Sequence, residues 1–292
     1  MVDVSDDGEA LASDMAKMST SEATWTDSEV TAMRETAALL KDMQPKPDPK
    51  LLAVAVLCSK CKPDEAAKKL KELARVVGPD FNVELSTAGL RLDILAKEST
   101  LASDDEWSAV AAQINNSYAA CGKDSDGRGI FWIRGGHISK EAISSGAAMR
   151  AGLLFWLACH ADYSTLRNGV NMVIDQSKGA ASDMKRSGLE GKMHKGFQSF
   201  PLRPQCIRIV VSSAVQRALI NSVLGVAAFL TRKKVLSRIL FVTSHADVAA
   251  ALPLASMPLY AGGEVDETAS AWVIRRLGAF PEPPPGLHTE YL

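Results

Sequence analysis

The chain has 292 residues, of which 47% are hydrophobic and 23% charged, and its formal net charge at pH 7 is -1. This is the composition of an ordinary globular protein, and a net charge so close to zero argues against a nucleic-acid binder that relies on a broad basic surface. The five cysteines are odd in number and scattered, and the N-terminus is acidic with no signal-peptide pattern, so we expect free thiols in a reducing, cytoplasmic setting. No apolar run reaches the roughly 20 residues that a membrane-spanning helix needs.

The N-terminal part of the sequence predicts a small helical unit behind an acidic tail. Residues 1–23 are rich in Asp, Ser, Thr and Glu with few apolar anchors, which predicts disorder. Thr26 and Glu29 have the spacing of a capping box, and the apolar stripe that follows predicts a helix. We expect a helical subdomain over residues 24–80, in which Leu51–Leu57 forms a short helix or strand.

The last helix of this unit begins at Pro63, where a proline and two acidic residues suit the free N–H groups of a first turn. We expect it to end at Gly78-Pro79.

From residue 85 to residue 280 the sequence alternates between strand-like and helical patterns, which favours an α/β fold with parallel strands. The expected helices run from Asp104 to Cys121 and from Gly146 to Leu157. A proline-rich tail covers residues 281–292. The expected strands are Ile130–Ile133, Val170–Asp175, Ile207–Val211 and Ile239–Val242.

An uncharged stretch, Ala218–Thr231, is the most unusual segment of the chain. It is apolar on more than one helical face, which is typical of a helix that is buried or that covers an apolar surface. A basic cluster follows it at once, formed by Arg232, Lys233, Lys234 and Arg238.

Several landmarks in order resemble the CRAL-TRIO lipid-binding domain, the family of retinaldehyde-binding, tocopherol transfer and fungal phosphatidylinositol transfer proteins. They are DSDGRGIFWIR, VIDQSKG, FPLRPQCIRIV, FLTRKK, RILFV and LPLASMPLYAGG, and the last of these is similar to the LP-x-x-x-GG turn of the family. The resemblance covers roughly residues 26–280. It implies a helical subdomain followed by a mostly parallel β-sheet flanked by helices, with residues 218–231 as a mobile lid helix.

The resemblance also implies a hydrophobic cavity that lies on the sheet and is closed by the lid. Alternate residues of the expected strands are apolar, and a period of two puts each set on one face of the sheet. The sequence alone also allows this face to pack on core helices without a ligand. The candidate lipid-binding residues are Phe131, Ile133, Val170, Met172, Ile174, Ile207, Ile209, Ile239 and Phe241 from the strands, and Leu219, Val223 and Leu230 from the lid.

The basic cluster is our candidate for contact with an anionic membrane, including phosphoinositides, and a solvated helix end is the alternative. In family members that bind phosphatidylinositol, a glutamate follows the proline that corresponds to Pro201, whereas this chain has Leu202 there. This difference argues against an inositol lipid in the pocket and leaves open an apolar terpenoid or another lipid.

We therefore expect a cytoplasmic, transiently membrane-associated protein that binds a small hydrophobic lipid and transfers or presents it at membranes. A non-transferring, lipid-sensing adaptor that recruits a protein partner is the alternative. We expect no catalytic residues, no metal, no nucleic-acid partner and no cofactor besides the bound lipid. Cys58-x-x-Cys61 lacks a second pair or a histidine at zinc spacing, so we interpret it as two buried thiols. Hydrolase and dinucleotide motifs of the Gly-x-Ser-x-Gly and Gly-x-Gly-x-x-Gly kind are missing.

Overall fold

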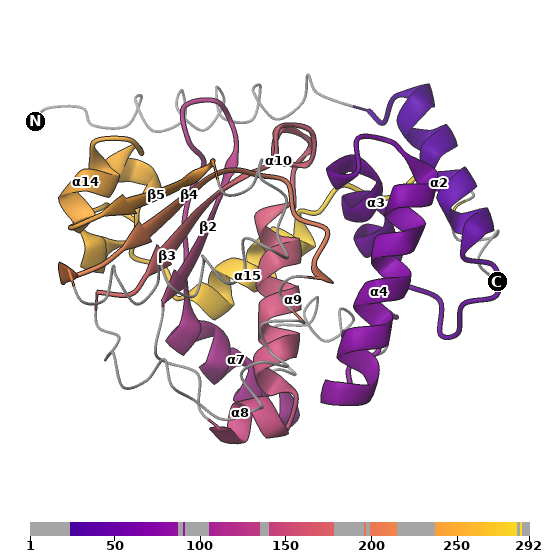
Figure 1. Ribbon diagram of the computed structural model, residues 1–292, viewed down its shortest axis with the longest axis horizontal. Coiled ribbons are helices and arrows are strands. Elements are labelled where there is room, and N and C mark those ends of the chain that lie inside the picture. Colours follow the sequence, from indigo (N-terminus) through magenta and orange to yellow (C-terminus); the bar gives the residue numbers. More distant parts are fainter. Residues whose placement is uncertain are drawn as a thin grey trace, which may run out of the picture.

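A computed structural model describes residues 24–86, 90, 105–134, 140–177, 196, 199–214, 237–284 and 287. Within these ranges the chain forms an α/β structure in which a five-stranded sheet lies between α14 and a layer of helices that includes α9 (Figure 1). In these parts of the chain, no helix combines the length and the apolar character that a membrane crossing requires.

The sheet has the strand order β1-β2-β3-β4-β5. The pairs β2–β3, β3–β4 and β4–β5 are parallel, and the short β1 runs antiparallel to β2, so the prediction of a mostly parallel sheet is confirmed. The strands are β1 (Tyr118–Ala119), β2 (Gly129–Arg134), β3 (Val170–Asp175), β4 (Pro204–Val210) and β5 (Ile239–Val242).

The helix expected to continue to Cys121 ends earlier. It is α7 (Asp105–Ser117), and the next two residues form β1, which pairs Tyr118 with Ile133 and Ala119 with Trp132. The helical stripe ends at Tyr118, where pairing with the edge of the sheet replaces the intrahelical hydrogen bonds.

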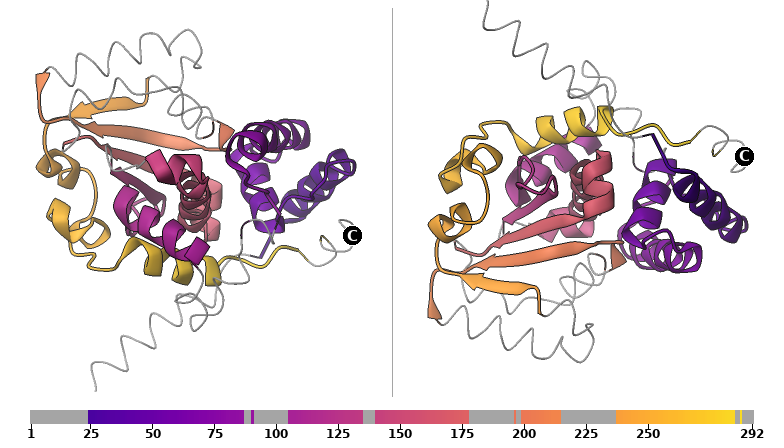
Figure 2. Two further views of the ribbon diagram at one scale, coloured as in Figure 1. Left: turned by 90° about the horizontal axis from the view of Figure 1, so that it is seen from below. Right: turned by 90° about the horizontal axis from the view of Figure 1, so that it is seen from above.

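Helices α7, α8 (Lys140–Ser144), α9 (Ala147–Cys159) and α15 (Ala269–Gly278) lie together on one side of the sheet (Figure 2). The short α10 (Tyr163–Asn168) leads into β3. Residues 245–261 cover part of the opposite side, with α14 (His245–Ala249) and two 3₁₀ turns, η3 (Leu254–Ser256) and η4 (Leu259–Ala261).

Three N-terminal helices, α2 (Asp27–Leu39), α3 (Pro49–Cys58) and α4 (Pro63–Phe81), stand as a group beside α9 and α10 (Figure 2). The capping box of Thr26 and Glu29 is present at the start of α2. The segment left open as helix or strand is the helix α3.

The end predicted for α4 is wrong. The helix continues through Gly78 and Pro79, and Asn82 ends it in a left-handed conformation with a φ of 51°. A proline is compatible with a helix when the hydrogen bonds around it can adjust, and a residue in the left-handed region is a common helix end.

One continuous apolar core joins the helical group to the sheet. It includes α3, whose residues Leu51–Cys58 are all buried, the buried residues of α9, and one face of β2, β3 and β4. A second, smaller core lies on the opposite face, between the sheet and residues 248–261. The helical group is therefore packed on the α/β part through shared apolar contacts.

Candidate functional site

The apolar candidates from the four longer strands come together on one face of the sheet in two rows. Strand pairing places each of them, except Val170, opposite another candidate on the neighbouring strand. Val170 lies at the amino end of the same face, beside Gly129. The first row is Phe131, Met172, Ile207 and Ile239, and the second, closer to the carboxyl ends of the strands, is Ile133, Ile174, Ile209 and Phe241.

Burial differs along these rows. Phe131 is 1% exposed and Val170 is 0% exposed, and both belong to the helix-covered core, where the ring of Phe131 lies 5.3 Å from that of Phe155. Ile133 and Ile174 at the strand ends, and both candidates on β5, are only partly buried. Met172, Ile207 and Ile209 on β3 and β4 are buried, at 9%, 8% and 4% exposed, so β5 is the strand on which both candidates are partly exposed.

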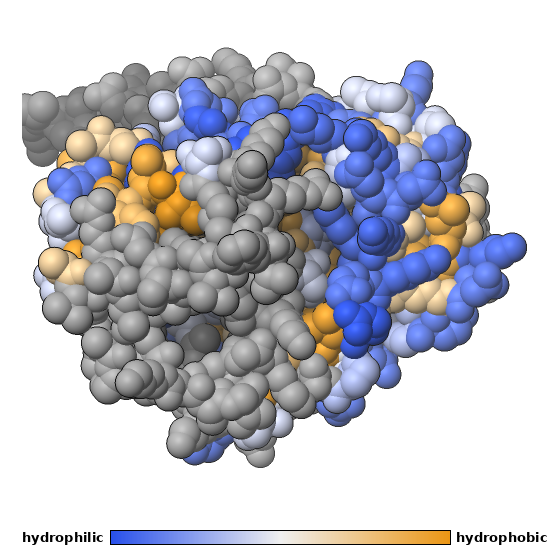
Figure 3. All heavy atoms as spheres, viewed as in Figure 1, coloured by the Kyte–Doolittle hydropathy of each residue, from blue (hydrophilic) through white to orange (hydrophobic). Residues whose placement is uncertain are grey.

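Strand β5 is an edge strand among the described residues, and it carries an apolar side chain at each of its four positions. Leu240, which points to the face opposite the two rows, is 49% exposed. Figure 3 shows hydrophobic surface at the position of this strand, whereas the surface over α4 is largely hydrophilic.

The lid residues Leu219, Val223 and Leu230 and the basic residues Arg232, Lys233 and Lys234 lie outside the described residues. Arg238 is described and has structural contacts. Its guanidinium donates to the backbone oxygen of Pro204, and its own backbone oxygen accepts from the N–H of Ile207 at 2.9 Å. Arg238 therefore helps to join the start of β5 to β4.

A polar cluster at the carboxyl end of β3 was not predicted from the sequence. Asp175 accepts a hydrogen bond from the hydroxyl of Ser177 at 2.6 Å, and its other oxygen lies 2.8 Å from Nε2 of His245 and 3.4 Å from the hydroxyl of Tyr260. Burial raises the pKa of Asp175, but the hydrogen bonds from Ser177 and His245 outweigh it, and the net pKa is lowered. The carboxylate therefore attaches α14 and η4 to the end of the sheet.

Trp132 lies on this second face, away from the two apolar rows. It is 0% exposed, its ring centroid is 6.2 Å from that of His245 and 6.3 Å from that of Tyr260, and its indole N–H has no hydrogen-bond partner in the described part of the chain. The Trp132 side chain thus packs under the Asp175 cluster.

The LP-x-x-x-GG-like segment has a structural explanation in this fold. The backbone of Val265 donates to Met257 and that of Leu259 donates to Val265, which folds residues 254–265 back on themselves. A Cβ atom at Gly263 would lie 2.1 Å from the backbone oxygen of Met257, and Gly262 has a φ of +84°. The two glycines are therefore needed to close this turn against the second face of the sheet.

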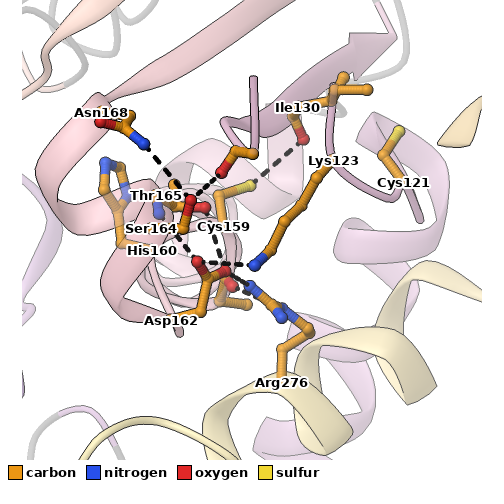
Figure 4. A network of polar contacts seen from close by, with 12 residues as sticks. Cys121, Lys123, Ile130, Cys159, His160, Asp162, Ser164, Thr165, Asn168 and Arg276 are labelled. Atoms are coloured by element: carbon orange, nitrogen blue, oxygen red, sulfur yellow. Dashed lines mark hydrogen bonds and ion pairs between the residues drawn. The ribbon is translucent and has the colours of Figure 1, made fainter. Parts of the chain in front are cut away.

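A second polar network surrounds Asp162 at the start of α10, at the opposite end of the sheet (Figure 4). Its carboxylate accepts from the backbone N–H of Thr165 at 2.8 Å and contacts Nζ of Lys123 at 2.9 Å and Nη2 of Arg276 at 2.5 Å. Burial raises the pKa of Asp162, but hydrogen bonds from Thr165 and Arg276 more than compensate and lower it overall. Asp162 thus holds two cations in place between β2 and α15.

The expectation of two buried thiols in Cys58-x-x-Cys61 is wrong for one of them. Cys58 is buried, whereas Cys61 is only partly buried, because the turn after α3 takes Lys60 and Cys61 into left-handed conformations and directs the chain outward. In the described ranges, no group of three or more His, Cys, Asp or Glu residues is arranged to hold a metal ion.

A comparison with models of known protein families finds none that matches this chain, and a search of curated proteins also finds no match.

Proposed function

We propose that this protein binds a hydrophobic lipid against the two apolar rows of its sheet and transfers or presents it at membranes. The observation that carries the proposal is the register of the sheet, which aligns Phe131, Met172, Ile207 and Ile239 in one row and Ile133, Ile174, Ile209 and Phe241 in the next. The partial exposure of both candidates on β5, Ile239 and Phe241, supports a ligand position at that end of the face.

Such a face suits a lipid chain on energetic grounds. Burying one methylene group contributes roughly 0.8 kcal/mol, so an acyl or isoprenoid chain gains several kcal/mol from contact with apolar side chains alone. Shape and a few polar groups would then select the lipid. Residues 215–236, which connect β4 to β5, contain the expected lid helix and three residues of the basic cluster, Arg232, Lys233 and Lys234.

The first experiment identifies the ligand. The full chain is purified under native conditions, its bound lipids are extracted and analysed by mass spectrometry, and release to acceptor vesicles is measured. A defined lipid that moves to the vesicles supports transfer. A defined lipid that stays bound supports the lipid-sensing adaptor, and protein that neither carries a lipid nor takes one up from vesicles overturns the proposal.

A pair of neighbouring substitutions tests the position of the ligand. Phe241→Gln places a polar group in the second apolar row, and Leu240→Gln makes a similar change one residue away on the opposite face. We expect lipid occupancy to fall in Phe241→Gln and to stay unchanged in Leu240→Gln. Equal occupancy in both variants would show that this face does not contact the lipid.

The proposed membrane contact is tested with Lys233→Ala/Lys234→Ala. Arg238 is left intact because it joins β5 to β4. We expect weaker binding to liposomes that contain anionic lipids, since each basic side chain near such a surface contributes about 1 kcal/mol. The control is Lys68→Ala/Lys71→Ala, which removes the same charge from the exposed side of α4.

A further inference from the structure

A small pocket lies at the amino end of β2, between the loop that precedes this strand, the end of α9, and α15. It measures about 130 Å³, against the roughly 30 Å³ that one water molecule occupies in the liquid, so it has room for a small polyatomic group. It lies at the opposite end of β2 and β3 from the Asp175 cluster. Its charged lining residues are Lys123, Arg275 and Arg276, and the rest of the lining is formed by Cys121, Gly122, Gly129, Ile130, Cys159 and Trp272.

The lining contains three cations and no carboxylate. Asp162 contacts Lys123 and Arg276, and Glu267 contacts Arg275, but neither acidic residue is part of the lining. The five charged groups together carry a net charge of +1, from three cations and two carboxylates. The carboxylates thus position the cations from outside the pocket and leave its interior without a negative charge.

Each cation keeps donors that these carboxylates do not use. Arg276 donates through Nε to the backbone oxygen of Ala158 and through Nη2 to Asp162, and Arg275 donates through Nε and Nη2 to Glu267. Among the described residues, Nη1 of either arginine has no hydrogen-bond partner. The ammonium group of Lys123 has three donors and makes one such contact, with Asp162.

The walls of the pocket are held by packing. Trp272 is 4% exposed, and its indole N–H donates to the backbone oxygen of Cys121 at 2.9 Å. At Gly129, a Cβ atom would lie 2.6 Å from the backbone oxygen of Cys159, so a larger residue there would displace the pocket wall. Lys123 and Arg276 approach Asp162 together in Figure 4, from different segments of the chain.

We propose that this pocket binds a single phosphate group, either as inorganic phosphate or as the terminal group of a phosphate monoester. Arginine and lysine donors form strong, charge-assisted hydrogen bonds to phosphate oxygens. The two thiols in the lining add no negative charge, because burial raises the pKa of Cys121 and Cys159, and each donates to a backbone oxygen, that of Ala119 and that of Ile130 respectively. This site does not depend on lipid binding at the sheet face.

The test measures binding of inorganic phosphate to the full chain by isothermal titration calorimetry at low and at physiological ionic strength. We expect saturable binding to one site and at least about a tenfold loss of affinity in Lys123→Gln and in Arg275→Gln, as is typical when one charge-assisted hydrogen bond is removed. Arg275→Gln complements Lys123→Gln because the Arg275 side chain is 61% exposed and its replacement leaves the core intact.

Arg75→Gln is the matched control. Arg75 is 71% exposed and forms the same two-bond ion pair with a glutamate, Glu72, but it lies on α4, outside this pocket. Absence of saturable phosphate binding by the unaltered protein, or an equal loss of affinity in Arg75→Gln, would overturn the proposal.

Vesicles of phosphatidylcholine with and without phosphatidic acid distinguish a lipid source of the phosphate from a soluble one. If the site takes a lipid headgroup, Arg275→Gln weakens both phosphate binding and binding to the phosphatidic acid vesicles. If it takes a soluble phosphate, only the calorimetric binding weakens. Either result supports the site.

Discussion

The sulfur of Cys58 lies 3.8 Å from Nε2 of His160, where α3 meets the end of α9. The other ring nitrogen, Nδ1, lies 2.8 Å from the backbone oxygen of Trp156, and because a carbonyl can only accept, Nδ1 carries the proton and Nε2 accepts from the thiol. Burial lowers the pKa of His160 to about 4 and raises that of Cys58 to about 12. The pair is therefore neutral at physiological pH and joins the helical group to the α/β part.

Because His160 is buried in its neutral form, the free energy of unfolding should depend on pH. The unfolded chain protonates His160 near pH 6.5 and the folded protein only near pH 4, so between these values the unfolded state holds more protons. The stabilisation is fully present above pH 6.5 and is lost as the pH falls toward 4, by on the order of 3 kcal/mol in total. Urea denaturation between pH 7 and pH 5, above most carboxylate titration, measures this slope. We expect His160→Gln to flatten it, and an unchanged slope in the variant would contradict the assignment.

The ion pair between Glu29 and Arg167 is a second link between the helical group and α10. Arg167 donates to both carboxylate oxygens, at 2.8 and 2.9 Å, and the Glu29 side chain is 7% exposed. The hydrogen bond from Arg167 lowers the pKa of Glu29 although burial opposes it. We expect Arg167→Met to lower the free energy of unfolding by about 2 kcal/mol, less than for a fully buried pair because Arg167 is about a third exposed.

The double variant Glu29→Gln/Arg167→Met should recover part of that loss, because it removes the unpaired charge. In the exposed pair of Glu72 and Arg75, Arg75→Gln should produce no comparable change in a urea denaturation curve.

Substitution by alanine should have opposite effects on stability at two of the glycines. Gly263→Ala would bring a Cβ atom to 2.1 Å from the backbone of Met257 and should destabilise the fold by roughly 2 kcal/mol or more. At Gly278, the last residue of α15, an added Cβ atom meets nothing within 4 Å outside its own helix and chain neighbours, so Gly278→Ala should stabilise by up to about 1 kcal/mol through helix propensity. Thermal unfolding of both variants measures the difference, and a neutral Gly263→Ala would show that the turn can rearrange.

Replacing Asp175 should destabilise only the segment that its carboxylate contacts. Because its carboxylate contacts both His245 and Tyr260, we expect Asp175→Asn to increase hydrogen exchange of backbone amides in residues 243–261 and to leave the amides of α3 and α9 protected. Asp266→Asn, at an exposed residue beyond η4, is the control and should leave the exchange pattern unchanged. Faster exchange throughout the molecule would indicate general destabilisation in place of a local one.

The sequence was most informative where local patterns decide the structure. The alternation of apolar residues located Val170–Asp175 and Ile239–Val242 with the bounds that the structure has, and the capping box located the start of α2. The errors at the ends of α7 and α4 arose where a neighbouring strand or a left-handed residue ends the helix. The first event depends on a strand that comes later in the chain, whereas the second has a local signal in Asn82, because asparagine is one of the residue types that end helices in the left-handed conformation.

The candidate sites show the same difference between features with a local sequence signal and contacts between distant segments. Period-two alternation predicted that Met172, Ile207 and Phe241 are apolar positions of strands, because side-chain direction within a strand is a local property. The contacts of Asp175 with His245 and Tyr260, 70 and 85 residues later in the chain, had no such signal.

The sequence by itself therefore determined which segments form helices and strands and that the strands have an apolar face. Hydrophobic periodicity can be recognised in this way because it follows from the backbone geometry of each element alone. Only the tertiary structure decided the register that aligns two apolar rows across four strands, the contact of Cys58 with His160, and the meeting of Lys123, Arg275 and Arg276 around one pocket. The physical reason is that each of these depends on how distant segments pack.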